Sequence, residues 1–101
     1  MARFDVFPAP GQAGPGYVLD VQADLLRELG TRVVVPLLPP SSAPRPARGL
    51  NPSFEIDGKS HLMLTQFIAA VLEKELKQAV ASLKAHSDDI TRALDILLTG
   101  Y

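Results

Sequence analysis

Few side chains in this 101-residue sequence are of the kinds that perform acid–base or metal chemistry. The two histidines, His61 and His86, lack the His-x-x-x-His or His-Glu spacing of a metal-binding helix, so we expect them on the surface or capping an element. The best carboxylate group comprises Asp20, Asp24 and Glu28. A hydrolytic pair needs one carboxyl group buried enough to keep its proton. Since nothing in the sequence indicates such burial, we interpret this group as a solvated face.

The glycines and the charge balance argue against two further kinds of chemistry. The glycines of 11–16 are interrupted by Pro15 and lead into a predicted strand, whereas a phosphate-binding loop leads into a helix. Ten basic residues against 11 acidic ones leave a net charge of -1. The basic surface expected of a protein that binds nucleic acid through its phosphates is therefore missing. We expect no catalytic site, no metal and no cofactor, and we favour an interaction protein over an enzyme.

Length and composition predict one cytoplasmic domain over residues 1–101. The chain is 47% hydrophobic and 21% charged and has no cysteine, as is typical of a folded protein without disulfides. Asp5 lies inside the only stretch that could begin a signal peptide. No apolar run approaches the roughly 18 residues needed to span a membrane.

Short alternating or β-branched runs predict a β-rich fold. We predict early strands over residues 3–7, 17–21 and 32–35. Pro8 stops the first, Pro36 closes the third, and Gly30 is a turn residue between the second and third. The Pro- and Gly-rich segment 8–16 and the Pro-rich segment 38–48 are predicted surface loops.

The clearest local signal is Asp57-Gly58, which separates two alternating segments, 53–56 and 59–64. Asp-Gly supplies the positive φ angles of a type I′ turn, so the sequence predicts a β-hairpin. Its apolar side chains alternate toward one face and are Phe54, Ile56, Leu62 and Leu64.

The C-terminal third favours helices. Residues 66–85 hold good helix formers with no glycine or proline, so propensity alone predicts a helix there. In the last segment Ser87 is the expected N-cap, Asp88 and Asp89 place negative charge in the first turn, and Gly100 ends the helix. Its apolar stripe comprises Ile90, Ala93, Leu94, Leu97 and Leu98. We expect Leu97 inside, and Thr99 and Tyr101 facing outward.

Several short motifs follow one another in an informative order. They are DVQAD at 20–24, RVVVPL at 32–37, LNP at 50–52, IDG at 56–58, VASL at 80–83 and the final helix before Gly100. This order closely resembles the CcdB family of plasmid-type toxins. The resemblance covers nearly the whole chain except 8–16 and 38–48, and the first two motifs are its most specific parts.

The resemblance implies a mainly β fold with a C-terminal α-helix, an SH3-like β-barrel of the CcdB type, assembled as a homodimer. It implies the toxin of a type II toxin–antitoxin pair, neutralised by a CcdA-like antitoxin whose disordered C-terminal part folds on the toxin. Family members bind the DNA gyrase A subunit and trap the complex in which DNA is cleaved, without catalysis by the toxin. The resemblance also places strand near 68–76, and we adopt strand over helix there.

By family position, the gyrase-facing residues are Ala23, Leu25, Leu26, Asp95, Leu98, Thr99, Gly100 and Tyr101. Relatives typically end in an aromatic residue followed by Trp-Gly-Ile, and the tryptophan stacks on an arginine of the target. Here Thr99 takes the tryptophan position and Leu98 that of the other aromatic. Threonine cannot stack, so gyrase affinity through this contact is expected to fall unless Tyr101 compensates.

This departure leaves alternatives open. One is a dimer of the same fold that binds only its antitoxin and no longer poisons gyrase. The other is a ribonuclease, since toxins of this barrel fold that cleave RNA exist; it rests on fold analogy alone. Asp20, Arg32 and His61 are the residues whose substitution would test it.

Overall fold

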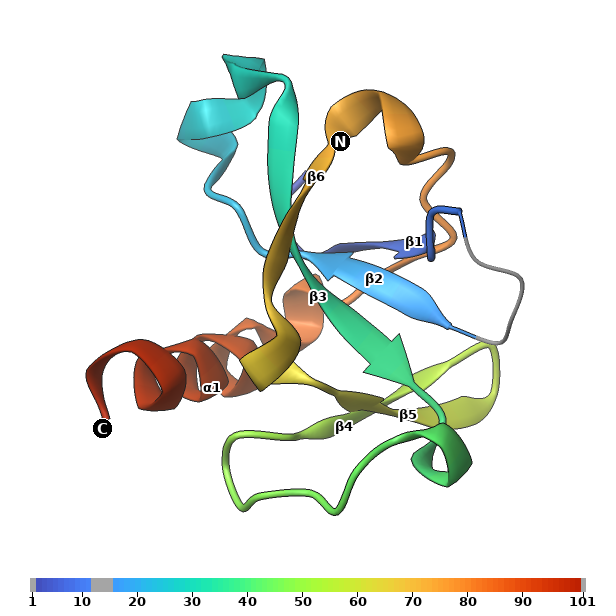
Figure 1. Ribbon diagram of the computed structural model, residues 1–101, viewed down its shortest axis with the longest axis vertical. Coiled ribbons are helices and arrows are strands. Elements are labelled where there is room, and N and C mark those ends of the chain that lie inside the picture. Colours follow the sequence, from blue (N-terminus) through green and yellow to red (C-terminus); the bar gives the residue numbers. More distant parts are fainter. Residues whose placement is uncertain (1, 12–15, 101) are drawn as a thin grey trace.

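The protein folds into a strongly curved antiparallel sheet and one C-terminal α-helix (Figure 1). The structure is a computed structural model that describes residues 2–11 and 16–100. Within these residues the strands are β1 (Asp5–Pro8), β2 (Tyr17–Asp20), β3 (Thr31–Leu38), β4 (Ser53–Ile56), β5 (Lys59–Met63), β6 (Ala69–Leu72) and β7 (Ala81–Ser82). Their order is β4-β5-β3-β2-β1-β7, and β6 pairs separately with β3. The predicted mainly β, barrel-like fold with a C-terminal helix is confirmed.

Strand β3 bends the sheet because it changes partners along its length. Its first half pairs with β6, from Thr31 to Val34, and its last residues, Leu37 and Leu38, pair with β5. The prediction that Pro36 closes this strand is wrong, since the strand continues to Leu38. Proline only removes a donor, and the Pro36 carbonyl still accepts a hydrogen bond from the Leu64 N–H at 2.9 Å.

The first strand starts later than predicted. Phe4 has a φ of 74°, in the left-handed region, so β1 begins at Asp5. Phe4 and Val6 nevertheless both lie in the main core, as their alternation predicted. Phe7 is buried as well, on the other face, where it packs with Val18 and Leu76. Both faces of this part of the sheet are therefore covered.

The Asp57-Gly58 hairpin is confirmed, but its predicted apolar face is wrong. Phe54 pairs with His61, whereas Leu62 pairs with Ser53, so Phe54 and Leu62 lie on opposite faces. The φ angles are 53° at Asp57 and 77° at Gly58, as a type I′ turn requires, and β4 pairs with β5 on either side. In residues 66–85 the strand interpretation is also confirmed, because Ala69–Leu72 pairs with Thr31–Val34. Pairing with β3 outweighs the helix propensity of the segment.

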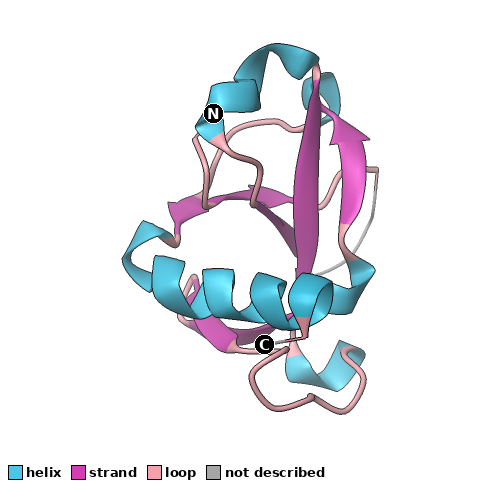
Figure 2. Ribbon diagram, turned by 90° about the vertical axis from the view of Figure 1, so that its left-hand side faces the viewer, coloured by secondary structure: helices cyan, strands magenta, loops and turns pink. Residues whose placement is uncertain are grey.

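Helix α1 (Ser87–Thr99) lies across the open side of the sheet (Figure 2). The N-cap is His86, so the prediction of Ser87 is wrong: the short 3₁₀ turn η5 (Lys84–His86) leads directly into the helix, and Ser87 is already helical. Asp88 and Asp89 occupy the first turn, and Gly100 ends the helix with a φ of 82°, as predicted.

The predicted apolar stripe of α1 is only partly buried. Ile90, Ala93 and Leu94 join the core, Leu97 is half-buried, and Leu98 is 71% exposed. The helix projects beyond the side of the barrel at its C-terminal end, so its last turn has no core to pack against (Figure 1).

The remaining 3₁₀ turns are η1 (Asp24–Leu29), η2 (Pro40–Ser42), η3 (Thr65–Phe67) and η4 (Glu73–Glu75). The predicted 38–48 loop is irregular apart from the end of β3 and η2. Of the predicted 8–16 loop, residues 12–15 lie outside the described residues. In the part of the chain that the structure describes, no helix is long and apolar enough to cross a membrane.

Candidate functional site

A cleft of about 470 Å³ opens between η1 and α1. We call it the η1–α1 cleft. Strand β3 and Ile68, the residue after η3, also contribute to its walls. Its lining residues are Arg3, Val21, Gln22, Ala23, Leu26, Leu29, Thr31, Val33, Ile68, Thr91, Leu94, Asp95 and Leu98.

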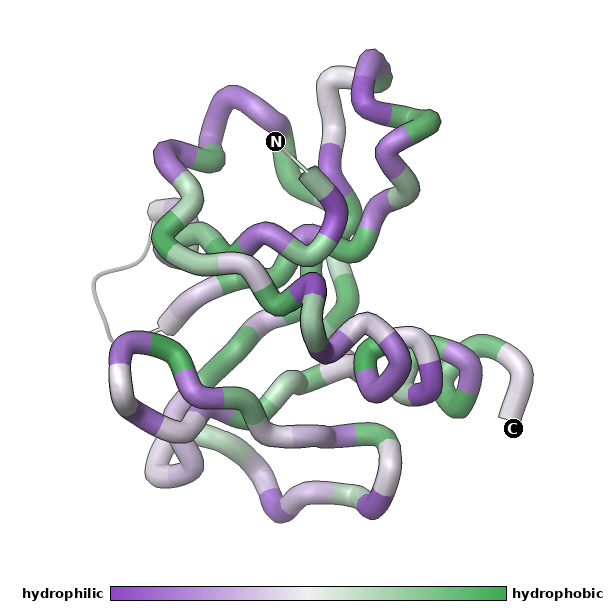
Figure 3. Tube along the Cα trace, turned by 180° about the vertical axis from the view of Figure 1, so that it is seen from behind, coloured by the Kyte–Doolittle hydropathy of each residue, from purple (hydrophilic) through white to green (hydrophobic). Residues whose placement is uncertain are grey.

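Exposed leucines surround this cleft. None of the residues of η1 is buried, and its leucines, Leu25, Leu26 and Leu29, are 91%, 45% and 62% exposed. Figure 3 shows hydrophobic stretches along η1 and along the C-terminal half of α1, on the same side of the molecule. Large apolar side chains gathered on one exposed surface are typical of a site that contacts another macromolecule.

Four of the residues predicted to face a partner line the η1–α1 cleft together. They are Ala23, Leu26, Asp95 and Leu98. The tertiary structure thus joins the two sequence segments, 23–26 and 95–98, that family position had selected.

The other predicted residues lie outside the lining. Leu25 points into solvent, and the Thr99 hydroxyl donates a hydrogen bond of 2.6 Å to the Asp95 carbonyl of its own helix. Gly100 ends α1, and Tyr101 lies outside the described residues.

Arg3 is a cleft residue that the sequence did not single out. Its backbone N–H donates to the Asp24 carboxylate at 2.8 Å, and its Nε donates to the Val21 carbonyl at 3.0 Å. The guanidinium lies over the Phe4 ring, 4.6 Å from the ring centre. These contacts fix a positive charge in the wall of a mainly apolar cleft. No local pattern marks Arg3, because its hydrogen-bond partners, Val21 and Asp24, lie in another segment.

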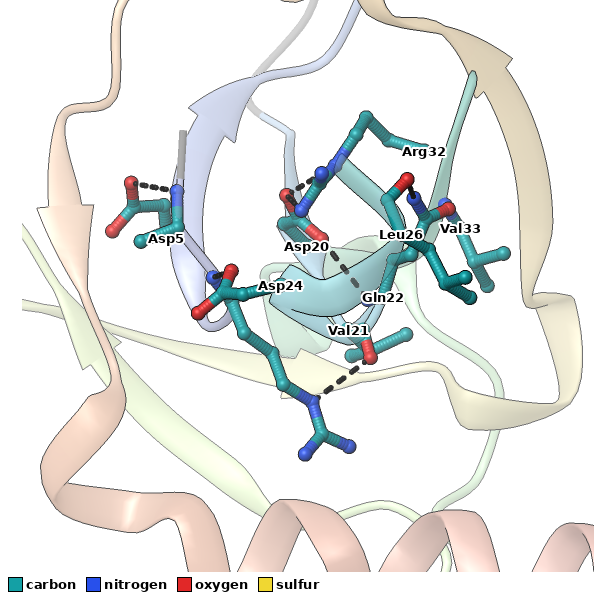
Figure 4. A network of polar contacts seen from close by, with 10 residues as sticks. Asp5, Asp20, Val21, Gln22, Asp24, Leu26, Arg32 and Val33 are labelled. Atoms are coloured by element: carbon teal, nitrogen blue, oxygen red, sulfur yellow. Dashed lines mark hydrogen bonds and ion pairs between the residues drawn. The ribbon is translucent and has the colours of Figure 1, made fainter. Parts of the chain in front are cut away.

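A buried ion pair joins β2 to β3. Arg32 Nε donates to Asp20 Oδ2 at 2.8 Å, Arg32 Nη2 lies 2.6 Å from the same oxygen, and neither side chain is exposed (Figure 4). Desolvation raises the pKa of the Asp20 carboxyl above its ordinary value of 3.8, although the hydrogen bond from Arg32 acts in the opposite direction. The predicted solvated face is therefore wrong for Asp20, whereas Asp24 and Glu28 are exposed.

Gln22 connects this ion pair to the cleft. Its backbone N–H donates to Asp20 Oδ1 at 3.0 Å. Its side chain accepts a hydrogen bond from the Val33 N–H at 3.1 Å and donates from Nε2 to the Leu26 carbonyl at 2.9 Å (Figure 4). The chain of contacts thus runs from a buried charge to the η1 wall of the cleft.

The two histidines lie apart from the cleft lining. His61 is buried, so its predicted surface position is wrong: Nδ1 lies 2.9 Å from the Lys59 carbonyl oxygen, and the ring meets Tyr17 edge to face. His86 is exposed, with its ring against Phe54. Among residues 2–11 and 16–100, no three His, Cys, Asp or Glu side chains lie close enough to share a metal ion.

Comparison with known proteins agrees with this architecture. A solved structure described as "Endoribonuclease in complex with its cognate antitoxin from Mycobacterial species" matches 97% of this chain and 94% of that chain, with a TM-score of 0.79 and 18% sequence identity. At this identity the match shows the fold alone. Residues 3–100 match the family model described as CcdB protein. Because this match spans nearly the whole chain, the protein belongs to the CcdB family.

Proposed function

We propose that this protein is the toxin of a type II toxin–antitoxin pair, and that it acts as a homodimer that binds the DNA gyrase A subunit and traps the cleaved-DNA complex. Membership of the CcdB family supports the toxin role and a CcdA-like antitoxin as partner. The observation that carries the gyrase proposal is the η1–α1 cleft, whose lining includes three exposed leucines, Leu26, Leu29 and Leu98. Apolar anchors in a pocket are the usual centre of a protein interface.

A non-enzymatic action fits the chemistry of this surface. The cleft lining is mainly aliphatic, and its charged members are Arg3 and Asp95. Asp20 and Arg32 have no exposed side-chain surface, so a dissolved substrate has no contact with them in this conformation. Protein recognition needs only the leucines and the fixed Arg3 guanidinium.

A second candidate is a dimer that binds its antitoxin but does not poison gyrase. Thr99 motivates it, because its hydroxyl is bonded to the Asp95 carbonyl and it presents no aromatic face. The η1–α1 cleft would then serve the antitoxin alone.

The third candidate, a ribonuclease, draws on the description of the endoribonuclease structure, whose likeness to this chain is one of fold. The residues suggested for such chemistry, Asp20, Arg32 and His61, are all buried. Phosphates of an RNA would have to displace core packing to reach them, so we rank this candidate last.

The proposal is tested by adding purified protein to gyrase in supercoiling and DNA-cleavage assays. Wild type should inhibit supercoiling and leave gyrase-linked cleaved plasmid. Leu98→Lys should weaken inhibition tens of times, since loss of a central apolar anchor removes about 2 kcal/mol or more of binding free energy. Val80→Lys is the matched control, because Val80 is also an exposed aliphatic residue, 54% accessible, outside the cleft lining.

Folded wild-type protein that neither inhibits gyrase nor leaves cleaved DNA at micromolar concentration would contradict gyrase poisoning. Titration with the cognate antitoxin and incubation with single-stranded RNA then separate the second and third candidates.

A further inference from the structure

We infer that Gln22, oriented by the buried Asp20–Arg32 pair, positions η1 as a wall of the partner-binding cleft. The inference rests on the proposed function for the role of the cleft, but its structural content concerns η1 alone. Asp20 and Gln22 of the DVQAD motif and Arg32 of the RVVVPL motif belong to one hydrogen-bonded network.

Segment η1 needs such an anchor because it has no hydrophobic one. None of the residues of Asp24–Leu29 is buried, and Leu26 departs from helical geometry with a φ of -100° and a ψ of 17°. The segment thus consists of two short 3₁₀ turns joined by a kink at Leu26, and not of one continuous helix. Its conformation therefore depends on polar contacts with the rest of the fold, of which the bond from Gln22 Nε2 to the Leu26 carbonyl lies in its middle.

The Gln22 side-chain amide is directed at Leu26 because both its oxygen and its nitrogen form hydrogen bonds. The side chain is 6% exposed, and its Oε1 accepts from the Val33 N–H, which leaves Nε2 directed at the Leu26 carbonyl. The backbone N–H of Gln22 is held in turn by Asp20 Oδ1. A reversed amide would place its NH₂ group against the Val33 N–H, so the hydrogen bonds define one orientation.

The Asp20–Arg32 pair fixes the carboxylate that binds the Gln22 backbone N–H. Both charges are fully buried. Among the described residues, neither Nη1 nor Nη2 of Arg32 has a well-aligned hydrogen-bond partner, although Nη2 lies 2.6 Å from Asp20 Oδ2 as an ion pair. An incompletely bonded buried ion pair contributes little net stability. Its contribution here is geometric: Arg32 holds one carboxylate oxygen, so that the other faces Gln22.

Loss of the Gln22 amide should therefore loosen η1 and reduce the fraction of molecules with a formed cleft. Apparent affinity falls in proportion to that fraction. If η1 remains formed in about one molecule in ten, binding weakens about tenfold. Residues distant from η1 should keep their native protection.

The test uses Gln22→Met, which keeps length but removes both hydrogen bonds, and Gln22→Glu, which keeps the acceptor for Val33 and loses the donor to Leu26. Asn51→Leu is the matched control, because Asn51 is also a buried amide. It anchors a different loop, through the Ala47 N–H and the Met63 carbonyl. Amide hydrogen exchange, the free energy of unfolding and inhibition of gyrase supercoiling are measured for each.

Both Gln22 variants should accelerate exchange selectively in residues 24–30 and raise the concentration for half-inhibition about tenfold. Asn51→Leu should lower global stability without either effect, once the folded fraction is taken into account. Unchanged exchange in 24–30 in both Gln22 variants would overturn the inference, as would faster exchange with unchanged inhibition. If wild type does not inhibit gyrase, the proposed function fails, and the exchange measurement still decides whether Gln22 positions η1.

Discussion

The Arg32 guanidinium meets the Asp20 carboxylate at 2.6 Å, and neither side chain is exposed to solvent. By strand alternation this pair shares a face of the sheet with Val18 and Val34, a face that also packs against Leu76. Removal from water raises the pKa of Asp20 despite the adjacent cation. The attraction between the two charges therefore only partly offsets the cost of removing them from water. We expect single substitutions of Asp20 or Arg32 to act differently from their joint replacement.

Arg32→Met should destabilise the fold by about 3–5 kcal/mol at neutral pH, because it leaves the buried Asp20 carboxylate without its cation. The double variant Asp20→Leu/Arg32→Met should be more stable than Arg32→Met, since it removes both charges. Urea denaturation of wild type, both single variants and the double variant checks this. A double variant no more stable than Arg32→Met would contradict this expectation.

Stability should also depend on pH through Asp20. Because its folded-state pKa is raised above 3.8, the folded chain binds this proton more tightly than the unfolded chain does. The carboxyl therefore adds stability that is present below the unfolded pKa and is lost as pH rises through the folded pKa. Relative to the Asp20→Leu/Arg32→Met variant, wild type should lose stability as pH rises from about 3.8 toward neutrality. Paired denaturation curves at several pH values test the sign, and the opposite slope would refute it.

Thr99→Trp should strengthen gyrase inhibition tens of times, because an aromatic anchor carries about 2 kcal/mol or more of an interface. Thr99 is exposed, so folding should be little affected. Arg92→Trp provides the control, as it adds the same side chain to an exposed position of α1 outside the cleft lining. Supercoiling assays compare both variants with wild type, and equal inhibition by wild type and Thr99→Trp would contradict a role for residue 99 in gyrase affinity.

The hairpin turn offers a test of the fold itself. Gly58→Ala should destabilise the protein by about 1–2 kcal/mol, because a Cβ is disfavoured at a φ of 77°, although space is open around it. Asp57→Gly should change stability much less, since glycine accepts the φ of 53° at that position. Thermal and urea unfolding should rank the variants in this order, and equal losses would contradict the turn assignment.

Local chemistry was enough to predict several elements. The Asp57-Gly58 turn, the helix that ends at Gly100 and the alternation of Phe4 with Val6 depend on φ preferences and spacing within a few residues. The order of short motifs was enough to identify the family. Of the cleft lining, family position identified Ala23, Leu26, Asp95 and Leu98, whereas Arg3 and Gln22 were missed.

The missed features depend on contacts between distant segments. Alternation in β2 and β3 separates two faces, but it does not say whether the second face is covered, and so the burial of Asp20 and Arg32 was not predicted. The continuation of β3 past Pro36 is set by pairing with β5, and the strand at 69–72 by pairing with β3.

By itself the sequence determined the Asp57-Gly58 turn, the C-terminal end of the last helix at Gly100, the mainly β class and the family. Only the tertiary structure decided which polar side chains are buried and how η1 and α1 meet in one cleft. The physical reason is the range of the interactions. Turn and helix-end preferences act within a few residues, whereas burial and cross-strand pairing depend on residues that only folding brings together.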